Sequence, residues 1–129
     1  MAFDLRVVVP NRPGVLLDTC NTLAQAGIEL FGFCGDIRPG ERWGYLHVLV
    51  EDAKAAETAL ESAGIEITKV QKVDVNTVDK HTGALAEEVE KYSREGKNIE
   101  VIYLATDGRI VIGTEDMLEE RPGVRMGDK

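Results

Sequence analysis

The first 75 residues alternate between strand-forming and helix-forming segments, and this order restricts the chain to few folds. Asp4 to Val9 ends in β-branched residues and stops at Pro10, which has no N–H group to donate to a sheet. A helical stretch follows, with apolar residues spaced by three and four: Leu16, Cys20, Leu23 and Ala24. Gly27 is suited to end this helix in the left-handed conformation.

The next segments repeat the alternation. Ile28 to Cys34 and Trp43 to Val50 are apolar and aromatic, and they flank a turn that contains Pro39-Gly40, so they predict a β-hairpin. Asp52 is placed to cap a second helix whose apolar stripe is Ala56, Ala59, Leu60 and Ala63. A fourth strand is expected from Ile65 to Val73 or Val75. The order βαββαβ predicts an α+β, ferredoxin-like sandwich, in which both helices cover one face of an antiparallel sheet.

The remainder of the chain resembles a second copy of the same unit. A shift of 69 positions places Gly14 on Gly83 and Gly27 on Gly96. A two-residue insertion then aligns Ile28-Glu29 with Ile99-Glu100. We therefore expect two tandem domains, residues 1–70 and 71–129.

The second copy is shorter than the first. Its second helix loses about one turn, and Val124 to Met126 form the stub of a last strand. Met117 and Leu118 supply nearly all the apolar surface of the clipped helix, so the second unit must pack on the first.

Composition excludes several classes of function. The net charge of −8 disfavours binding to nucleic acid or to anionic membranes. The first residues lack the features of a signal peptide and two cysteines form no disulfide framework, so we expect a cytoplasmic protein. Cys20, Cys34, His47 and His81 have no zinc-type spacing, and we expect neither a metal nor a cofactor.

The turn between the first strand and the first helix is the most informative local feature. Pro10-Asn11-Arg12-Pro13-Gly14 exposes the N–H groups of a helix start, which suit a carboxylate, and Gly14 lets a ligand approach the backbone. The alternative is structural: Asn11 caps the helix and Pro13 sets its first turn.

The strand, the turn Asn11-Arg12-Pro13-Gly14-Val15-Leu16 and the helix ending Ala26-Gly27-Ile28 resemble the ACT family of regulatory domains across residues 4–70. Residues 79–109 resemble it more weakly. The resemblance implies that paired units bind an amino acid or similar small ligand at their interface, and we expect a homodimer. Carried over by position, the contacts come from Asn11, Arg12, Pro13, Gly14, Val15 and Leu16, with Ile28, Glu29 and Leu30 of a neighbouring unit.

One position departs from the family pattern. Many amino-acid-binding members have an asparagine where this chain has Glu29, and Glu100 takes the corresponding place in the second copy. A carboxylate there is open to three interpretations: it accepts an ammonium group, it excludes anionic ligands, or it is a solvated residue in a unit without a ligand.

The sequence favours a regulatory sensor without catalysis. Neither His47 nor His81 lies in a catalytic motif, and Asp107-Gly108 is typical of a tight hairpin turn. The alternative is an interaction or oligomerisation module, in which paired sheets and helix faces hold subunits and no ligand binds. Trp43 and Tyr45, near the hairpin tip, are open to two interpretations: a contact surface, or by default residues packed against the sheet. A small enzyme on a ferredoxin-like scaffold is a third class.

Overall fold

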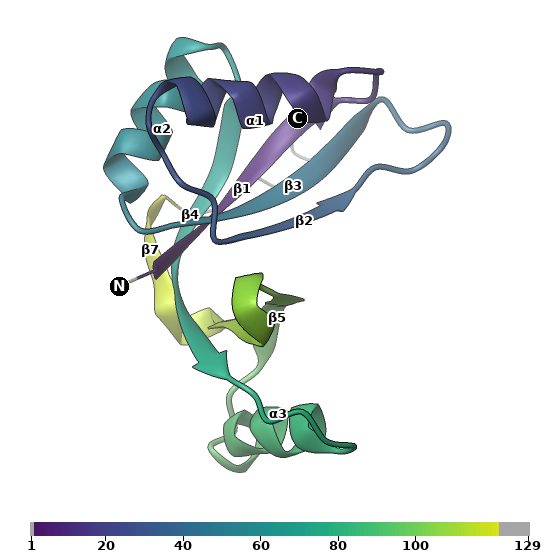
Figure 1. Ribbon diagram of the computed structural model, residues 1–129, viewed down its shortest axis with the longest axis vertical. Coiled ribbons are helices and arrows are strands. Elements are labelled where there is room, and N and C mark those ends of the chain that lie inside the picture. The colour runs from purple at the N-terminus through teal and green to yellow at the C-terminus, as the bar shows by residue number, and fades with distance from the viewer. Residues whose placement is uncertain (1, 122–129) are drawn as a thin grey trace.

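The computed structural model describes residues 2–121, and the element types follow the expected order. The elements are β1 (Ala2–Pro10), α1 (Val15–Gln25), β2 (Gly32–Asp36), β3 (Trp43–Val50), α2 (Ala53–Ser62), β4 (Glu66–Thr77), α3 (Ala84–Arg94), β5 (Ile99–Leu104), β6 (Arg109–Thr114) and β7 (Leu118–Arg121). Short 3-10 turns occupy Thr106–Gly108 and Glu115–Met117. Figure 1 shows α1 and α2 together at one end of the molecule and α3 at the other.

The strands form one antiparallel sheet in the order β2-β3-β1-β4-β6-β5, with β7 also paired to β4. Strand β4 has 12 residues and serves both halves of the chain. Its first part, Glu66 to Val73, pairs with β1, and its last part, Asp74 to Thr77, pairs with β6. The expected domain boundary between residues 70 and 71 falls inside this strand, and the division into two domains stays a prediction.

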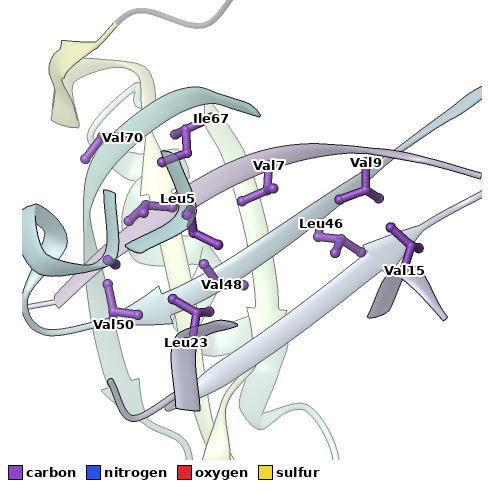
Figure 2. Close-up of a cluster of buried hydrophobic side chains, with 12 residues drawn as sticks. Leu5, Val7, Val9, Val15, Leu23, Leu46, Val48, Val50, Ile67 and Val70 are labelled. Carbon is purple, nitrogen blue, oxygen red and sulfur yellow. The ribbon is translucent and has the colours of Figure 1, made fainter. Parts of the chain in front are cut away.

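The first core lies between α1, α2 and one face of the sheet, as Figure 2 shows for residues from β1, β3, β4 and α1. Alternate residues of β1 and β3 point to this face because side chains of a strand alternate between its two sides. The buried members are Leu5, Val7, Val9, Val15, Leu23, Leu46, Val48, Val50, Ala56, Leu60, Ile67 and Val70. Both helices therefore cover one face, as the sequence predicted.

The buried face of α1 differs from the predicted stripe. Val15, Thr19 and Leu23 are buried, whereas Leu16 is exposed and Cys20 only partly buried. Thr19 can occupy the core because its hydroxyl donates to the Val15 carbonyl at 2.9 Å, which satisfies its polar atom. The sequence pattern placed the more apolar residue inside, and packing turned the helix by about one position.

The helix ends confirm the repeat pattern locally. Gly27, Gly64 and Gly96 all have positive φ. The backbone N–H of the residue after each glycine donates to a carbonyl in the last turn of the helix: Ile28 to Leu23, Ile65 to Leu60 and Lys97 to Tyr92. Asp52 caps α2 by accepting from the Ala55 N–H at 3.0 Å. Strand β2 was predicted from Ile28 but begins at Gly32, because residues 28–31 form the extended connection after the cap.

The sheet curls until its two edge strands meet. Gly32 of β2 forms an isolated bridge with Ala105, and the Thr106 N–H donates to the Phe31 carbonyl at 2.9 Å. The face turned away from α1 and α2 thus encloses a second cluster: Leu49, Val73, Val101, Tyr103 and Val111. A tyrosine from the second half completes this cluster, so the two halves share a core.

A buried carboxylate lies beside this second cluster. Asp4 is 1% exposed and accepts from the Tyr103 hydroxyl at 2.6 Å through one oxygen, while its other oxygen lies 2.8 Å from His47 Nδ1. Burial, followed by the charge of Asp4, raises the pKa of Tyr103 far above its ordinary value. Paired polar groups of this kind stabilise a fold mainly because breaking one pairing leaves a buried charge without a partner.

The second half has a smaller apolar core and a polar one beside it. Tyr92 of α3 packs with Ile110 and Ile112, and its hydroxyl donates to Asp74 at 2.6 Å. The predicted clipped helix is a single 3-10 turn, Glu115–Met117, and Leu118 already belongs to β7. The predicted strand stub at Val124 to Met126 lies outside the described residues.

Replacing Tyr103 with phenylalanine removes the hydroxyl that binds Asp4. We expect the free energy of unfolding to fall by about 1–3 kcal/mol, because one oxygen of a buried carboxylate loses its donor. Urea denaturation at pH 7 measures this change. Tyr45→Phe is the control, since the Tyr45 ring lies under Arg6 and its hydroxyl makes no hydrogen bond within the described residues. Equal stability of the two variants would contradict the role given to Asp4.

The raised pKa of Tyr92 leads us to expect that the protein loses stability at alkaline pH. Burial and the hydrogen bond to Asp74 raise its pKa to about 12, from an ordinary value of about 10. Its contribution is therefore complete below pH 10 and decreases between pH 10 and 12, where the unfolded chain releases the proton first. The unfolding free energy should fall by up to about 1.4 kcal/mol per pH unit from this residue. Urea denaturation series from pH 8 to 11.5 should show a shallower fall for Tyr92→Phe, and identical slopes would disprove this.

Candidate functional site

The turn before α1 has the geometry expected of a backbone binding site. Gly14 is the N-cap of α1 with φ +89°, a left-handed conformation that suits glycine, and no side chain within the described residues caps the helix. Gly83, its counterpart before α3, has φ +88° and also lacks a side-chain cap. The Val15 N–H donates back to the Arg12 carbonyl at 3.4 Å, so the N–H groups that the described residues leave without a partner at the positive end of the helix dipole are those that follow it, of Leu16 and Leu17.

Asn11 does not cap α1, so the structural alternative is wrong in this detail. Its side-chain amide donates to the carbonyls of Arg38 and Glu41 at 3.1 and 2.8 Å, and its backbone N–H donates to Arg42 at 2.9 Å. These three bonds hold the turn against the tip of the β2–β3 hairpin. Asn11 positions the turn, and its amide is no longer available to a ligand.

Arg12 is paired within the same turn. Its guanidinium lies 2.8 Å from Asp18, one turn into α1, and donates to the Pro13 carbonyl at 3.2 Å. Both side chains are about half exposed, so the pair contributes little stability. It does partly neutralise the cation, and Arg12 is therefore a weaker carboxylate ligand than its charge suggests.

Apolar surface surrounds the turn. Val15 is buried, but Leu16 is 44% exposed and its neighbour Leu17 is 62% exposed. Trp43, at the hairpin tip, is 48% exposed. A large apolar side chain in solvent next to exposed helix N–H groups favours contact with another molecule.

The other half of the predicted site lies at the far end of the helix. Ile28, Glu29 and Leu30 follow the C-terminal cap of α1, whereas residues 11–16 precede and open it (Figure 1). A helix of 11 residues is about 16 Å long, so one small ligand cannot contact both groups within one unit. The two groups can form one site only when different units or chains supply them.

A groove beside the turn was not predicted from the sequence. It has a volume of about 610 Å³ and is lined by the end of β1, the inner side of α1 and the turn between α2 and β4: Val8, Val9, Pro10, Arg12, Val15, Asp18, Thr19, Asn21, Thr22, Gln25, Trp43, Ala63, Gly64, Ile65 and Glu66. Its buried members are Val8, Val9, Val15 and Thr19, and amide and charged side chains are among the exposed ones.

The second half contains the same groove at the same positions. A hollow of about 180 Å³ is lined by Thr77, Val78, Asp79, His81, Ala84, Glu87, Glu88 and Lys91, and every one of these residues lies 69 positions after a residue that lines the first groove. The pairing of a basic side chain with a carboxylate recurs too, because His81 Nε2 lies 3.9 Å from Glu87 where Arg12 pairs with Asp18 in the first copy. A repeated groove could have been found from the sequence only by comparing the two copies residue by residue.

The repeated groove differs in charge. The positions of Thr19 and Thr22 hold Glu88 and Lys91, which pair at 3.1 Å, and Glu88 also accepts from Asn76 at 3.0 Å. Glu88 is 8% exposed, so this pair fills space that the two threonines leave open in the first groove. The first groove is therefore better suited to receive a ligand than the second.

Glu29 and Glu100 have different environments although the repeat aligns them. Glu100 pairs with Lys69 at 3.2 Å. Glu29 is exposed and has no partner among the described residues; it lines a hollow together with Leu30, Phe31 and residues of the β5–β6 turn. Only Glu29 is therefore free to meet a ligand.

The histidines do not form a catalytic arrangement. His47 is held against Asp4, and His81 lies 2.9 Å from the Thr82 carbonyl through Nδ1. Within residues 2–121, no group of three or more His, Cys, Asp or Glu side chains is arranged to hold a metal ion. No helix in this part of the chain has the length and apolar character needed to cross a membrane.

Comparison with known proteins places the fold. No curated protein matches the sequence significantly. Among solved structures, protein BT0572 from Bacteroides thetaiotaomicron is 24% identical with a TM-score of 0.72, covering 88% of this chain and 77% of that one. The regulatory subunit of aspartate kinase from Thermus thermophilus is 21% identical with a TM-score of 0.65, covering 88% and 82%. Aspartokinase alpha and beta subunits are 21% identical with a TM-score of 0.61, covering 91% and 84%.

These structures are similar in fold over 88–91% of this chain. The sequence itself matches the profile of the ACT domain pair over residues 1–123. That match covers the turn at Gly14, its counterpart at Gly83 and the shared strand β4. The chain belongs to the family of ACT domain pairs.

Proposed function

We propose that this protein is a non-catalytic, cytoplasmic regulatory sensor that binds an amino acid or similar small ligand. The observation that carries the proposal is the uncapped turn at Gly14, where helix N–H groups and a left-handed glycine present backbone donors suited to a carboxylate. Membership of the ACT domain pair family supports a regulatory role. Similarity to structures described as regulatory subunits of aspartate kinase supports the same role by analogy of fold.

The site would form between two copies of the chain. The turn residues 11–16 and the segment Ile28–Leu30 lie at opposite ends of α1. Two α1 helices paired antiparallel about a two-fold axis would bring each turn against the partner's Ile28–Leu30 segment, and would create two equal sites. The exposed side chains of Leu16 and Leu17 give such a pairing an apolar contact. We therefore propose a homodimer.

The alternative is a module that pairs chains without any ligand. The same exposed leucines favour it, and so does Trp43 at the hairpin tip. The two functions differ in one respect, because only the sensor is stabilised by a small molecule.

The test is thermal melting of the protein with each of the twenty amino acids and common nucleotides. A ligand that binds only the folded state raises the midpoint, because it stabilises the fold by an amount that grows with the logarithm of its concentration over Kd; at 100 Kd this is about 2.7 kcal/mol. Gly14→Asn should weaken the apparent affinity for the ligand at least tenfold and so reduce the shift in the melting midpoint. Asparagine keeps the left-handed turn but places a side chain where the ligand approaches.

Gly40→Asn is the matched control, since Gly40 also has positive φ and lies in an open turn at the hairpin tip. It should leave the ligand response unchanged. No stabilisation by any compound, combined with a dimer in analytical ultracentrifugation, would replace the sensor with the interaction module.

A further inference from the structure

We propose that the groove beside α1 binds a purine nucleoside. The groove lies within a single chain, and neither Leu16, Leu17 nor the segment Ile28–Leu30 lines it. It shares only Arg12 and Val15 with the predicted amino-acid contacts. This second site therefore requires neither an amino-acid ligand nor a second chain, and it can exist whether or not the proposed sensor site does.

The buried part of the lining is mainly apolar. Three of its four buried residues are valines, Val8, Val9 and Val15. The fourth, Thr19, uses its hydroxyl to bond the Val15 carbonyl. A ligand surface over these residues must be apolar, because a polar atom there would lose water without gaining a partner. The groove volume of about 610 Å³ is within the range of roughly 300–1,000 Å³ that small-molecule sites have.

Trp43 supplies an aromatic ring to the groove. It is the partner of Pro10 in the β1–β3 ladder, and both residues line the groove. Trp43 is 48% exposed, so its indole offers a face on which a planar ring can stack. Nucleobases stack on such a face because each base has a π surface. A flat ring also has apolar faces that can lie against the valines.

One side of α1 offers polar groups to the remainder of the ligand. The lining residues Asp18, Asn21, Thr22 and Gln25 are spaced by three and four, which places them in a row along the helix. Asp18 pairs with Arg12 through Oδ2, and within the described residues neither its Oδ1 nor the Asn21 amide takes part in a hydrogen bond. The carboxylate oxygen can accept from a ribose hydroxyl, and the amide can both donate and accept.

The charges of the groove disfavour ionised ligands. Arg12 and Asp18 neutralise each other at 2.8 Å, and Glu66 adds a second carboxylate to the lining. A phosphate would meet two carboxylates and a paired guanidinium, in a chain of net charge −8. A free amino acid would compete with Asp18 for the same guanidinium. An uncharged ligand avoids both costs.

A purine nucleoside combines the properties that the groove requires. Its base is planar and apolar on both faces, its ribose carries hydroxyls, and it has no charge. A sugar alone lacks the flat ring and would place hydroxyls against the valines. The base therefore stacks on Trp43, and the ribose lies towards Asp18 and Asn21.

The second half of the chain lacks this site. Its hollow has a volume of only about 180 Å³, and the pair of Glu88 and Lys91 holds the positions of Thr19 and Thr22. Within the described residues, no tryptophan, tyrosine or phenylalanine lines it. We therefore expect one nucleoside to bind per chain.

The experiment is a titration of the whole protein with adenosine, followed by calorimetry and by the fluorescence of Trp43, the one tryptophan of the sequence. We expect saturable quenching with one adenosine bound per chain. Uridine should bind at least tenfold more weakly, because its single ring stacks over a smaller area. Adenine, which lacks the ribose, and AMP, which adds a phosphate, should each bind at least tenfold more weakly as well.

Two variants test the groove itself. Trp43→Leu removes the stacking ring and should weaken adenosine binding at least tenfold in calorimetry. The double variant Thr19→Glu, Thr22→Lys copies the ion pair of the second half and should abolish binding. Thermal melting checks that each variant folds. Because Trp43 is an exposed residue, Trp43→Leu keeps the test valid even where the buried substitution at Thr19 prevents folding.

Leu104→Ala is the matched control, because Leu104 is 67% exposed and lies outside the groove. It should bind adenosine as the natural chain does. No saturable response to adenosine, unchanged affinity in Trp43→Leu, or equal binding of uridine or AMP would overturn the nucleoside site. An amino acid that stabilises the natural chain should stabilise Trp43→Leu equally, which distinguishes failure at this groove from failure at the Gly14 turn.

Discussion

Strand β4 is the constraint on which the rest of the structure depends. Its first part pairs with β1 on the side of β3 and β2, and its last part pairs with β6 on the side of β5. Because one continuous strand belongs to both parts of the sheet, the second half cannot turn freely against the first. The twist of the strands then carries β5 round towards β2, where the bridge at Gly32 and Ala105 closes the curl.

The shared interior makes this closure specific. Asp4 from the first strand accepts from Tyr103, 99 residues later in the chain, and lies against His47. An apolar pair at this place would tolerate a slip of register, whereas a buried carboxylate requires its donors in place.

The two copies have kept their geometry and changed their chemistry. Gly14 and Gly83 have nearly the same φ, and the grooves beside α1 and α3 are lined at the same positions. In the second groove the ion pair of Glu88 and Lys91 occupies the place of two threonines. The repeat thus presents the same backbone arrangement twice, with one groove open and the other largely filled by an ion pair.

The sequence by itself determined the elements and the candidate turn. Apolar periodicity, the helix-ending glycines and Pro10 act over a few residues, so they predict local structure without knowledge of the fold. The Asn11–Leu16 turn was predicted for the same reason, and the shift of 69 residues matched α1 to α3. The predicted start of β2 and the predicted buried face of α1 were wrong, because packing across the sheet decides both.

Only the tertiary structure decided which distant residues meet. The burial of Asp4 and Thr19 and the presence of Glu29 and Arg109 in the lining of one hollow depend on how the sheet and helices pack. No local pattern encodes the distance between residues 29 and 109. That distance is set by hydrogen bonds between strands far apart in the chain, which form only when the whole sheet is assembled.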